Sequence, residues 1–143
     1  MANVHDVAAY ILRAHGRMTT MKLQKLVYYS QAWSLVWDER PMFKERIQAW
    51  ANGPVAPDLY RRHQGLFKVS KWPLGKPETL SQDARDTVDA VLRFYGDKTA
   101  QYLSDLTHSE RPWIEARCGL APMERGASTI SHASMAEYYG SLQ

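Results

Sequence analysis

Apolar and polar positions follow a helical period most clearly between Met21 and Trp37. One stripe along this segment is apolar or small, and it consists of Leu23, Leu26, Val27, Ser30, Trp33, Ser34 and Trp37. Much of the opposite side is apolar as well, with Tyr28, Tyr29, Ala32, Leu35 and Val36. A helix that is apolar nearly all round cannot face water. We therefore predict that this helix is the buried centre of the domain, entered from the surface through a polar first turn.

Capping residues and prolines predict shorter helices around the central one. A first helix runs from Val4 to a stop at Gly16, Thr19 or Thr20 caps the central helix, and the residues before Pro41 end it. Later helices are expected at 57–63 with Pro57 in the first position, from Ser81 to Gly96, at 99–107, at 112–117 and after Ser131. In the helix at 99–107, the side expected to be buried carries Tyr102, Leu103 and Leu106.

Extended structure is indicated at two places. Residues 46–51 alternate between polar and apolar types and suit a short strand, with which residues 68–70 can pair. Asn52–Pro57 is a stiff turn, and residues 64–79 are expected to form a long surface connection. The sequence therefore predicts a mainly α fold. We expect a single compact helical domain over residues 1–143 around a central buried helix, with at most a small two-stranded β element.

Composition narrows the class of protein. A chain of 143 residues fits one domain, and it has neither an apolar run that would span a bilayer nor a signal-peptide pattern. The lone Cys118 leaves no internal disulfide, so we expect a cytoplasmic protein. Residues 1–76 hold 12 Lys and Arg against 5 Asp and Glu, whereas residues 77–143 hold 6 against 10. This asymmetry favours either an acidic partner for the first half or pairing of the two halves within the fold.

Catalytic and metal-ligating patterns are weak. The histidines His5, His15, His63, His108 and His132 lack the spacing of a zinc site, and Cys118 has no CxxC partner. There is no nucleotide-binding glycine loop and no Gly-x-Ser-x-Gly. His108, Ser109 and Glu110 are adjacent, but immediate neighbours rarely converge on one reacting atom, and Ser109 is better explained as a helix cap. We predict a protein that is not an enzyme and uses no metal or cofactor.

Nucleic-acid binding is the weaker alternative. Arg13, Arg17, Lys22 and Lys25 surround a connection of helix-turn-helix length and are expected to form one basic edge that would suit phosphates. The helix that follows is too apolar to lie in a major groove, where exposed polar side chains must read bases. Nucleic acid is therefore not the partner we expect, and autoregulation by DNA binding ranks second.

Several segments carry a family resemblance. Residues 20–33 read Thr-Met-Lys-Leu-Gln-Lys-Leu-Val-Tyr-Tyr-Ser-Gln-Ala-Trp, and residues 50–57 read Trp-Ala-Asn-Gly-Pro-Val-Ala-Pro. With Pro41-Met42-Phe43, with residues 107–116 and with Ile130-Ser131 before the last helix, they resemble the Panacea family of antitoxins, also called SocA-like. The likeness runs over nearly the whole chain and in the right order.

The resemblance implies a function. Its members are small cytoplasmic bacterial or prophage proteins that bind and neutralise a toxin encoded beside them. It also implies an alternative role, that of an adaptor that delivers its toxin to an ATP-dependent protease. Many family members carry an extra segment beyond the Panacea domain, whereas this chain is close to the bare domain. The identity of the toxin stays open for that reason.

Candidate toxin-binding residues combine a rigid turn with aromatic and arginine side chains, the types enriched at interface hot spots. They are Trp50, Asn52, Gly53, Pro54, Val55, Pro57, Tyr60 and Arg61. The alternative is that the glycine and prolines only shape the turn and the aromatic rings belong to the core. Lys22, Gln24 and Lys25 are added as surface candidates on the central helix, because burying two unpaired ammonium groups would be costly.

Overall fold

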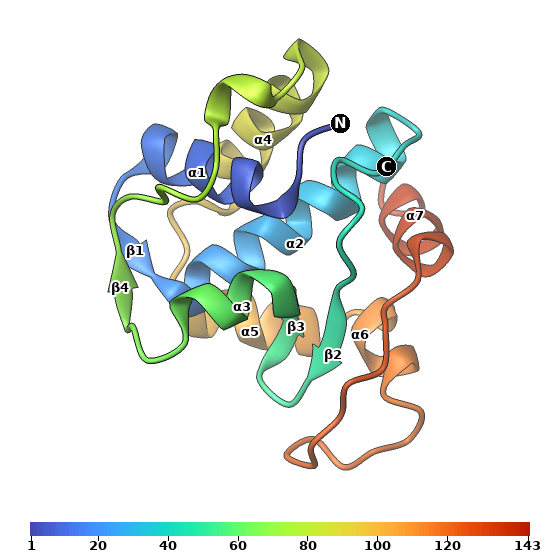
Figure 1. Cartoon of the computed structure of the whole chain (residues 1–143). Helices are drawn as coiled ribbons and strands as arrows, with labels where there is room; N and C mark the ends of the chain where they lie inside the picture. The colour runs from blue at the N-terminus through green and yellow to red at the C-terminus, as the bar shows by residue number, and fades with distance from the viewer.

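The longest helix, α2 (Thr20–Trp37), runs through the middle of the molecule, and most of its side chains are buried (Figure 1). The computed structural model describes residues 1–143. Helix α2 contacts α1 (Val4–His15), α4 (Gln82–Tyr95), α5 (Ala100–His108) and α7 (His132–Gly140). The mainly α fold and the central buried helix are confirmed. None of the helices combines the length and the apolar character needed to cross a bilayer.

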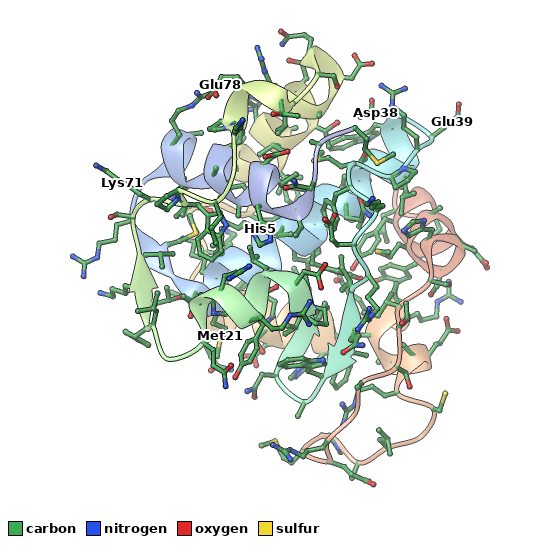
Figure 2. The ribbon with its side chains drawn as sticks, in the orientation of Figure 1. His5, Met21, Asp38, Glu39, Lys71 and Glu78 are labelled. Atoms are coloured by element: carbon green, nitrogen blue, oxygen red, sulfur yellow. The ribbon has the colours of Figure 1, made fainter.

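Side-chain caps fix where the helices begin. Thr19 accepts a hydrogen bond from the backbone N–H of Lys22, and Ser81, Thr99 and Ser131 cap α4, α5 and α7 in the same way. Helix α3 (Pro57–His63) starts with Pro57 at its first position, as expected. Asp38 and Glu39 follow the end of α2 (Figure 2), and the positive φ of Glu39, 55°, turns the chain away from the helix.

The turn before α6 (Arg111–Ala116) corrects one expectation. Ser109 does not cap α6, because it closes the end of α5, where its hydroxyl donates to the carbonyl of Leu106. Glu110 precedes α6 and is buried. Tyr102 corrects another, since it is 51% exposed, whereas α5 buries Leu103 and two small polar residues against the core.

Two short antiparallel ribbons complete the fold. Strand β2 (Gln48–Trp50) pairs with β3 (Gly53–Val55), and β1 (Met18–Thr19) pairs with β4 (Lys68–Val69). The expected pairing of residues 68–70 with 47–50 is therefore wrong. A two-residue turn at Ala51 and Asn52 returns the chain directly onto β2, and Gly53 supplies the φ of 119° that follows this turn. A short 3-10 helix, η1 (Pro77–Thr79), lies against α1.

Residues from distant parts of the chain meet at two places in the fold. Glu110 accepts hydrogen bonds from the hydroxyls of Tyr29 at 2.8 Å and Tyr139 at 2.7 Å. The ring of Tyr29 also stacks on Tyr95 of α4, with centroids 4.1 Å apart. Burial raises the pKa of Glu110, and both hydroxyls stabilise its carboxylate. Beside β2, the N–H of Ala49 donates to Ser128 O at 2.8 Å, so the segment before α7 covers the outer edge of the hairpin.

Candidate docking pocket beside the β2–β3 hairpin

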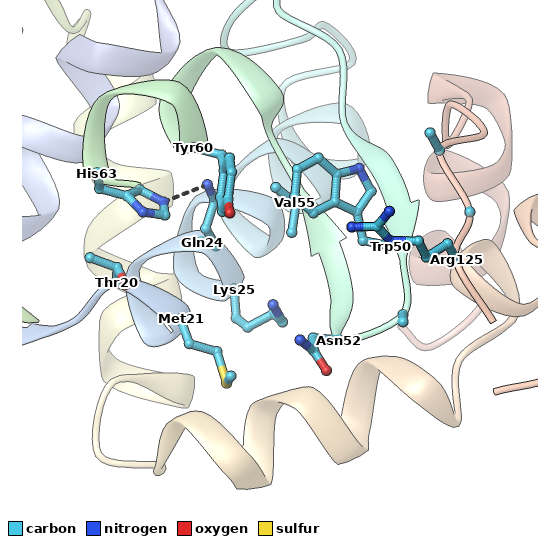
Figure 3. Close-up of a pocket in the computed structure, with 13 residues that line it drawn as sticks. Thr20, Met21, Gln24, Lys25, Trp50, Asn52, Val55, Tyr60, His63 and Arg125 are labelled. Carbon is cyan, nitrogen blue, oxygen red and sulfur yellow. Dashed lines mark hydrogen bonds between the residues drawn. The ribbon is translucent and has the colours of Figure 1, made fainter. Parts of the chain in front are cut away.

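A pocket of about 700 Å³ lies between the first turns of α2, the β2–β3 hairpin and α3 (Figure 3). The loop between α6 and α7 forms the remaining side. The pocket is lined by Thr20, Met21, Gln24, Lys25, Trp50, Ala51, Asn52, Val55, Tyr60, His63, Arg125, Gly126 and Ala127. Its volume falls in the range of ordinary ligand-binding clefts.

Gln24 fixes α3 and the hairpin to the central helix. Its side-chain carbonyl accepts the N–H of Ala56 at 2.9 Å, and its amide donates to Ala56 O at 3.3 Å. The same amide lies 3.0 Å from Nε2 of His63. Gln24 is only 3% exposed, so the expectation that it lies on the surface is wrong. The Gln24 side chain supplies hydrogen-bond partners for both the N–H and the carbonyl of Ala56, the residue between β3 and α3. This explains why a polar side chain is buried there.

Lys25 is buried as well, at 1% exposure, and the expectation that it lies on the surface is wrong. Its side chain runs from α2 beneath the hairpin toward Asn52 (Figure 3), and its Nζ donates one hydrogen bond, to Pro54 O at 3.4 Å. None of the ion pairs in the structure includes Lys25. Burial lowers the pKa of Lys25 to about 8.

Gly53 makes the space that Lys25 occupies. A Cβ on Gly53 would lie 2.6 Å from Cε of Lys25 and 3.1 Å from the hydroxyl of Thr107 on α5. The end of the Lys25 side chain therefore packs under a residue without a side chain, and Lys25 is one of the residues that line the pocket. The cost of removing the Lys25 ammonium from water was the reason to expect it on the surface. The buried side chain does bear this cost, and the lowered pKa of Lys25 reflects it.

Aromatic side chains form the outer wall of the pocket. The rings of Trp50 and Tyr60 meet edge to face with centroids 4.9 Å apart, and both residues are half-buried. Trp50 is held in place by its Nε1, which donates to Gln48 at 2.8 Å, and by its carbonyl, which accepts from Trp113 at 2.8 Å. The wall is therefore preformed and presents ring surface to the pocket.

His63 is a buried member of the pocket lining, and its surroundings favour the neutral ring. Burial, and to a smaller extent the charge of Lys25, lower its pKa below the ordinary value. A Gln amide nitrogen can only donate, so Nε2 of His63 is the acceptor and the proton of the neutral ring lies on Nδ1. Across the structure, no group of three or more His, Cys, Asp or Glu side chains could hold a metal ion.

The structure brings together six of the residues expected to bind a partner. Trp50, Asn52, Val55, Tyr60, Gln24 and Lys25 line the pocket. Gly53, Pro54 and Pro57 are buried behind the lining, where they shape the hairpin and the start of α3. Arg61 is exposed outside the pocket and pairs with Asp58, and Lys22 lies outside it, with Nζ 2.6 Å from Gly96 O.

The other lining residues were missed by sequence reasoning. His63 could have been found, because it follows the candidate Tyr60 by three residues on one helix, and that spacing places both on one face. Arg125–Ala127 come from a loop with no periodic pattern, far along the chain from the hairpin, and no sequence signal connects the two. The basic edge expected near α1 also changes, because Arg13 and Arg17 are exposed whereas Lys25 is buried. Helix α2 is surrounded by other helices and cannot enter a groove of DNA.

Comparison with known proteins places the chain in a family. The model described as "Antitoxin SocA-like, Panacea domain" matches residues 23–114, which is well over half of the 143 residues. The match confirms the resemblance seen in the sequence. It covers α2 from Leu23 onward, the hairpin and α3, and leaves out the first turn residues Thr20 and Met21 and the loop that carries Arg125. No curated protein and no solved structure matches the chain.

Proposed function

The chain belongs to the SocA-like antitoxin family with a Panacea domain, and we propose that it neutralises a cognate toxin by binding it directly. The toxin would be the product of a neighbouring gene. In this proposal the antitoxin covers or distorts the active surface of the toxin and catalyses no reaction. Proteolysis of the antitoxin would free the toxin.

The pocket beside the hairpin is the observation that supports this proposal on the structural side. Its wall combines the half-buried rings of Trp50 and Tyr60 with exposed Asn52, and Arg61 stands exposed nearby. Trp, Tyr and Arg are the residue types that dominate binding energy at protein interfaces. The hairpin is fixed by Gln24 and Trp113, so little conformational entropy is lost when a partner docks.

Co-expression with the neighbouring gene tests the proposal. We expect the wild-type chain to restore growth and to co-purify with the toxin. Trp50→Ala and Arg61→Glu should each lower the affinity for the toxin by at least about tenfold while the variants remain folded. Both restored growth and co-purification should weaken as a result. Arg93→Glu makes the same charge change at an exposed position of α4, outside the pocket, and should behave as wild type.

The same experiment distinguishes neutralisation from delivery to a protease. Under direct neutralisation, the amount of toxin stays constant while its effect disappears. A fall in toxin level that is reversed when the host's ATP-dependent protease is deleted would instead identify an adaptor. If the chain neither restores growth nor co-purifies with the toxin, the proposal is wrong.

A further inference from the structure

Lys25 gives the pocket a chemical preference. We propose that the pocket receives an acidic side chain, Asp or Glu, from the bound toxin and seats its carboxylate on the Lys25 ammonium. This inference rests on the proposed function and adds the chemistry by which the partner is recognised.

The first observation is the unused bonding capacity of Lys25. An ammonium group has three N–H donors, and Lys25 uses one of them in a long contact of 3.4 Å to Pro54 O. No carboxylate pairs with it, although it is 1% exposed. With a pKa of about 8 the amine is mostly charged at neutral pH. A buried charge with free donors beside a cavity is best satisfied by an anion that enters the cavity.

The second observation is the charge of the lining. Of the 13 lining residues, Lys25 and Arg125 are cationic and none is Asp or Glu. Lys25 forms the floor, whereas Arg125 is exposed at the rim and enters on the Trp50 side (Figure 3). An anion is thus attracted at the rim and held at the floor, while cations are repelled by both residues. The apolar surface of Met21, Val55 and Trp50 suits the methylene groups that carry such a carboxylate.

The near-complete burial of Lys25 selects the source of the carboxylate. Because Lys25 is only 1% exposed, a group that contacts its ammonium must be slim enough to pass between the residues that cover it. A Glu or Asp carboxylate stands at the end of a flexible side chain, so the backbone that carries it can stay at the rim. A chain-terminal carboxylate is attached to the backbone itself, which would have to enter the floor. The side-chain source therefore fits better.

Titration of the full chain with small probes tests this chemistry. The probe is N-acetyl-glutamic acid α-amide, which carries only a side-chain carboxylate, and the readout is the NMR signal of the Lys25 ammonium and Cε. We expect a saturable shift at about millimolar probe, the affinity range of such small ligands. N-acetyl-glutamine α-amide, which lacks the charge, should give no shift. Lys25→Met should abolish binding of the acidic probe, observed through the amide signals of the hairpin.

Three results would overturn the inference. The first is equal binding of the glutamine probe, and the second is undiminished binding to Lys25→Met. The third is tighter binding of N-acetyl-leucine or inorganic phosphate, which would assign the pocket to a terminal carboxylate or to a phosphate. Because methionine has nearly the length of lysine and no charge, Lys25→Met should fold, and a thermal melt will verify that it does.

The toxin itself separates failure of this inference from failure of the proposed function. Lys25→Met should bind the toxin at least about 30-fold more weakly than wild type. If wild type and Lys25→Met neutralise equally, the antitoxin function stands and the role of Lys25 is wrong. If wild type does not bind the toxin but binds the acidic probe through Lys25, the antitoxin function is wrong and the carboxylate site stands.

Discussion

Two cations are buried against the same hairpin, and their surroundings differ. Arg117 follows α6, is 2% exposed, and donates to four carbonyl oxygens, those of Ala49, Ala121, Pro122 and Glu124. Its guanidinium also lies over the ring of Trp113 at 4.9 Å. Lys25 on the other strand's side has one long contact, to Pro54 O, and an open cavity beyond it.

The comparison distinguishes a charge that is hydrogen-bonded within the chain from one that is poorly satisfied there. Arg117 ties the loop of residues 117–126 to β2, because both of its terminal nitrogens donate to backbone carbonyls, and Nε is the one guanidinium nitrogen without an acceptor. Lys25 makes only one long hydrogen bond, to Pro54 O, and no ion pair. The contacts within the chain therefore offset little of the free energy that burying its charge costs. A buried group that is poorly satisfied in the free protein is where a ligand gains most by binding.

The largest effect is expected at Arg117. Arg117→Met should lower the free energy of unfolding by about 3–4 kcal/mol, because four backbone carbonyls lose a charged donor at once. Thermal denaturation should show a drop in Tm of about 10 °C or more. The folded variant should bind the N-acetyl-glutamic acid α-amide probe more weakly only because the loop that carries the rim residue Arg125 is displaced. A Tm equal to that of wild type would remove the structural role of Arg117.

Lys25→Met should act in the opposite direction and raise the free energy of unfolding by about 3 kcal/mol at pH 7. The reason is that the folded state no longer holds an uncompensated charge, whose cost follows from a pKa of about 8 against the ordinary 10.5. Chemical denaturation of both proteins measures the difference. A destabilised Lys25→Met would show that the ammonium is satisfied within the free chain.

The advantage of Lys25→Met should shrink as the pH rises from about 8 to about 10. In this window the folded chain loses the Lys25 proton before the unfolded chain does, so the unfolded state binds more protons and wild type gains stability. His63 and His108 interact with Lys25, but burial lowers the pKa of both, so they are neutral throughout. A stability difference that stays constant between about pH 8 and about pH 10 would contradict the buried-charge account.

Gln24→Met provides the matched comparison one residue away. It replaces a buried polar side chain by the same apolar one, but here the lost bonds satisfy both backbone groups of Ala56. We expect a loss of about 2 kcal/mol, measured in the same denaturation series. The sign should therefore reverse between positions 24 and 25. If both variants gain stability, the cost of burying a polar side chain decides the outcome at both positions, and the number of hydrogen bonds it makes does not.

The smallest effect on stability is expected at Arg125. Arg125→Gln changes an exposed side chain and should alter the free energy of unfolding by less than about 0.5 kcal/mol. It should slow association with the toxin several-fold at low salt and leave dissociation nearly unchanged, because a rim charge attracts without being buried. Stopped-flow binding at two salt concentrations distinguishes the two rates. A change confined to dissociation would place Arg125 inside the contact.

Local signals in the sequence predicted the fold well. The apolar pattern of α2 and the capping residues Thr19, Ser81 and Ser131 depend on neighbours within a few positions, and the structure confirms them. Strand pairing depends on which distant segment lies alongside, and alternation alone did not reveal that β2 would pair with β3.

Sequence reasoning named only part of the pocket lining, for a similar reason. The residue types at Trp50 and Tyr60 marked the hairpin region, but burial of Gln24 and Lys25 depends on the absence of a side chain at Gly53 and on Ala56 as a partner. Those contacts are about thirty residues away in the chain. General cost arguments favour an exposed lysine, and only the packed structure shows an exception.

Helix α7 has a practical consequence for anyone who wishes to shorten the chain. It lies beyond the 23–114 segment, yet Tyr139 supplies one of the two hydroxyls on Glu110 and its OH lies 2.9 Å from that of Tyr28. Excising the recognised segment would strip Glu110 of a donor and open the tyrosine cluster to water. Minimal versions for binding assays or crystallisation should therefore retain both flanks, since the sequence signature of the family is narrower than the unit that holds its own core together.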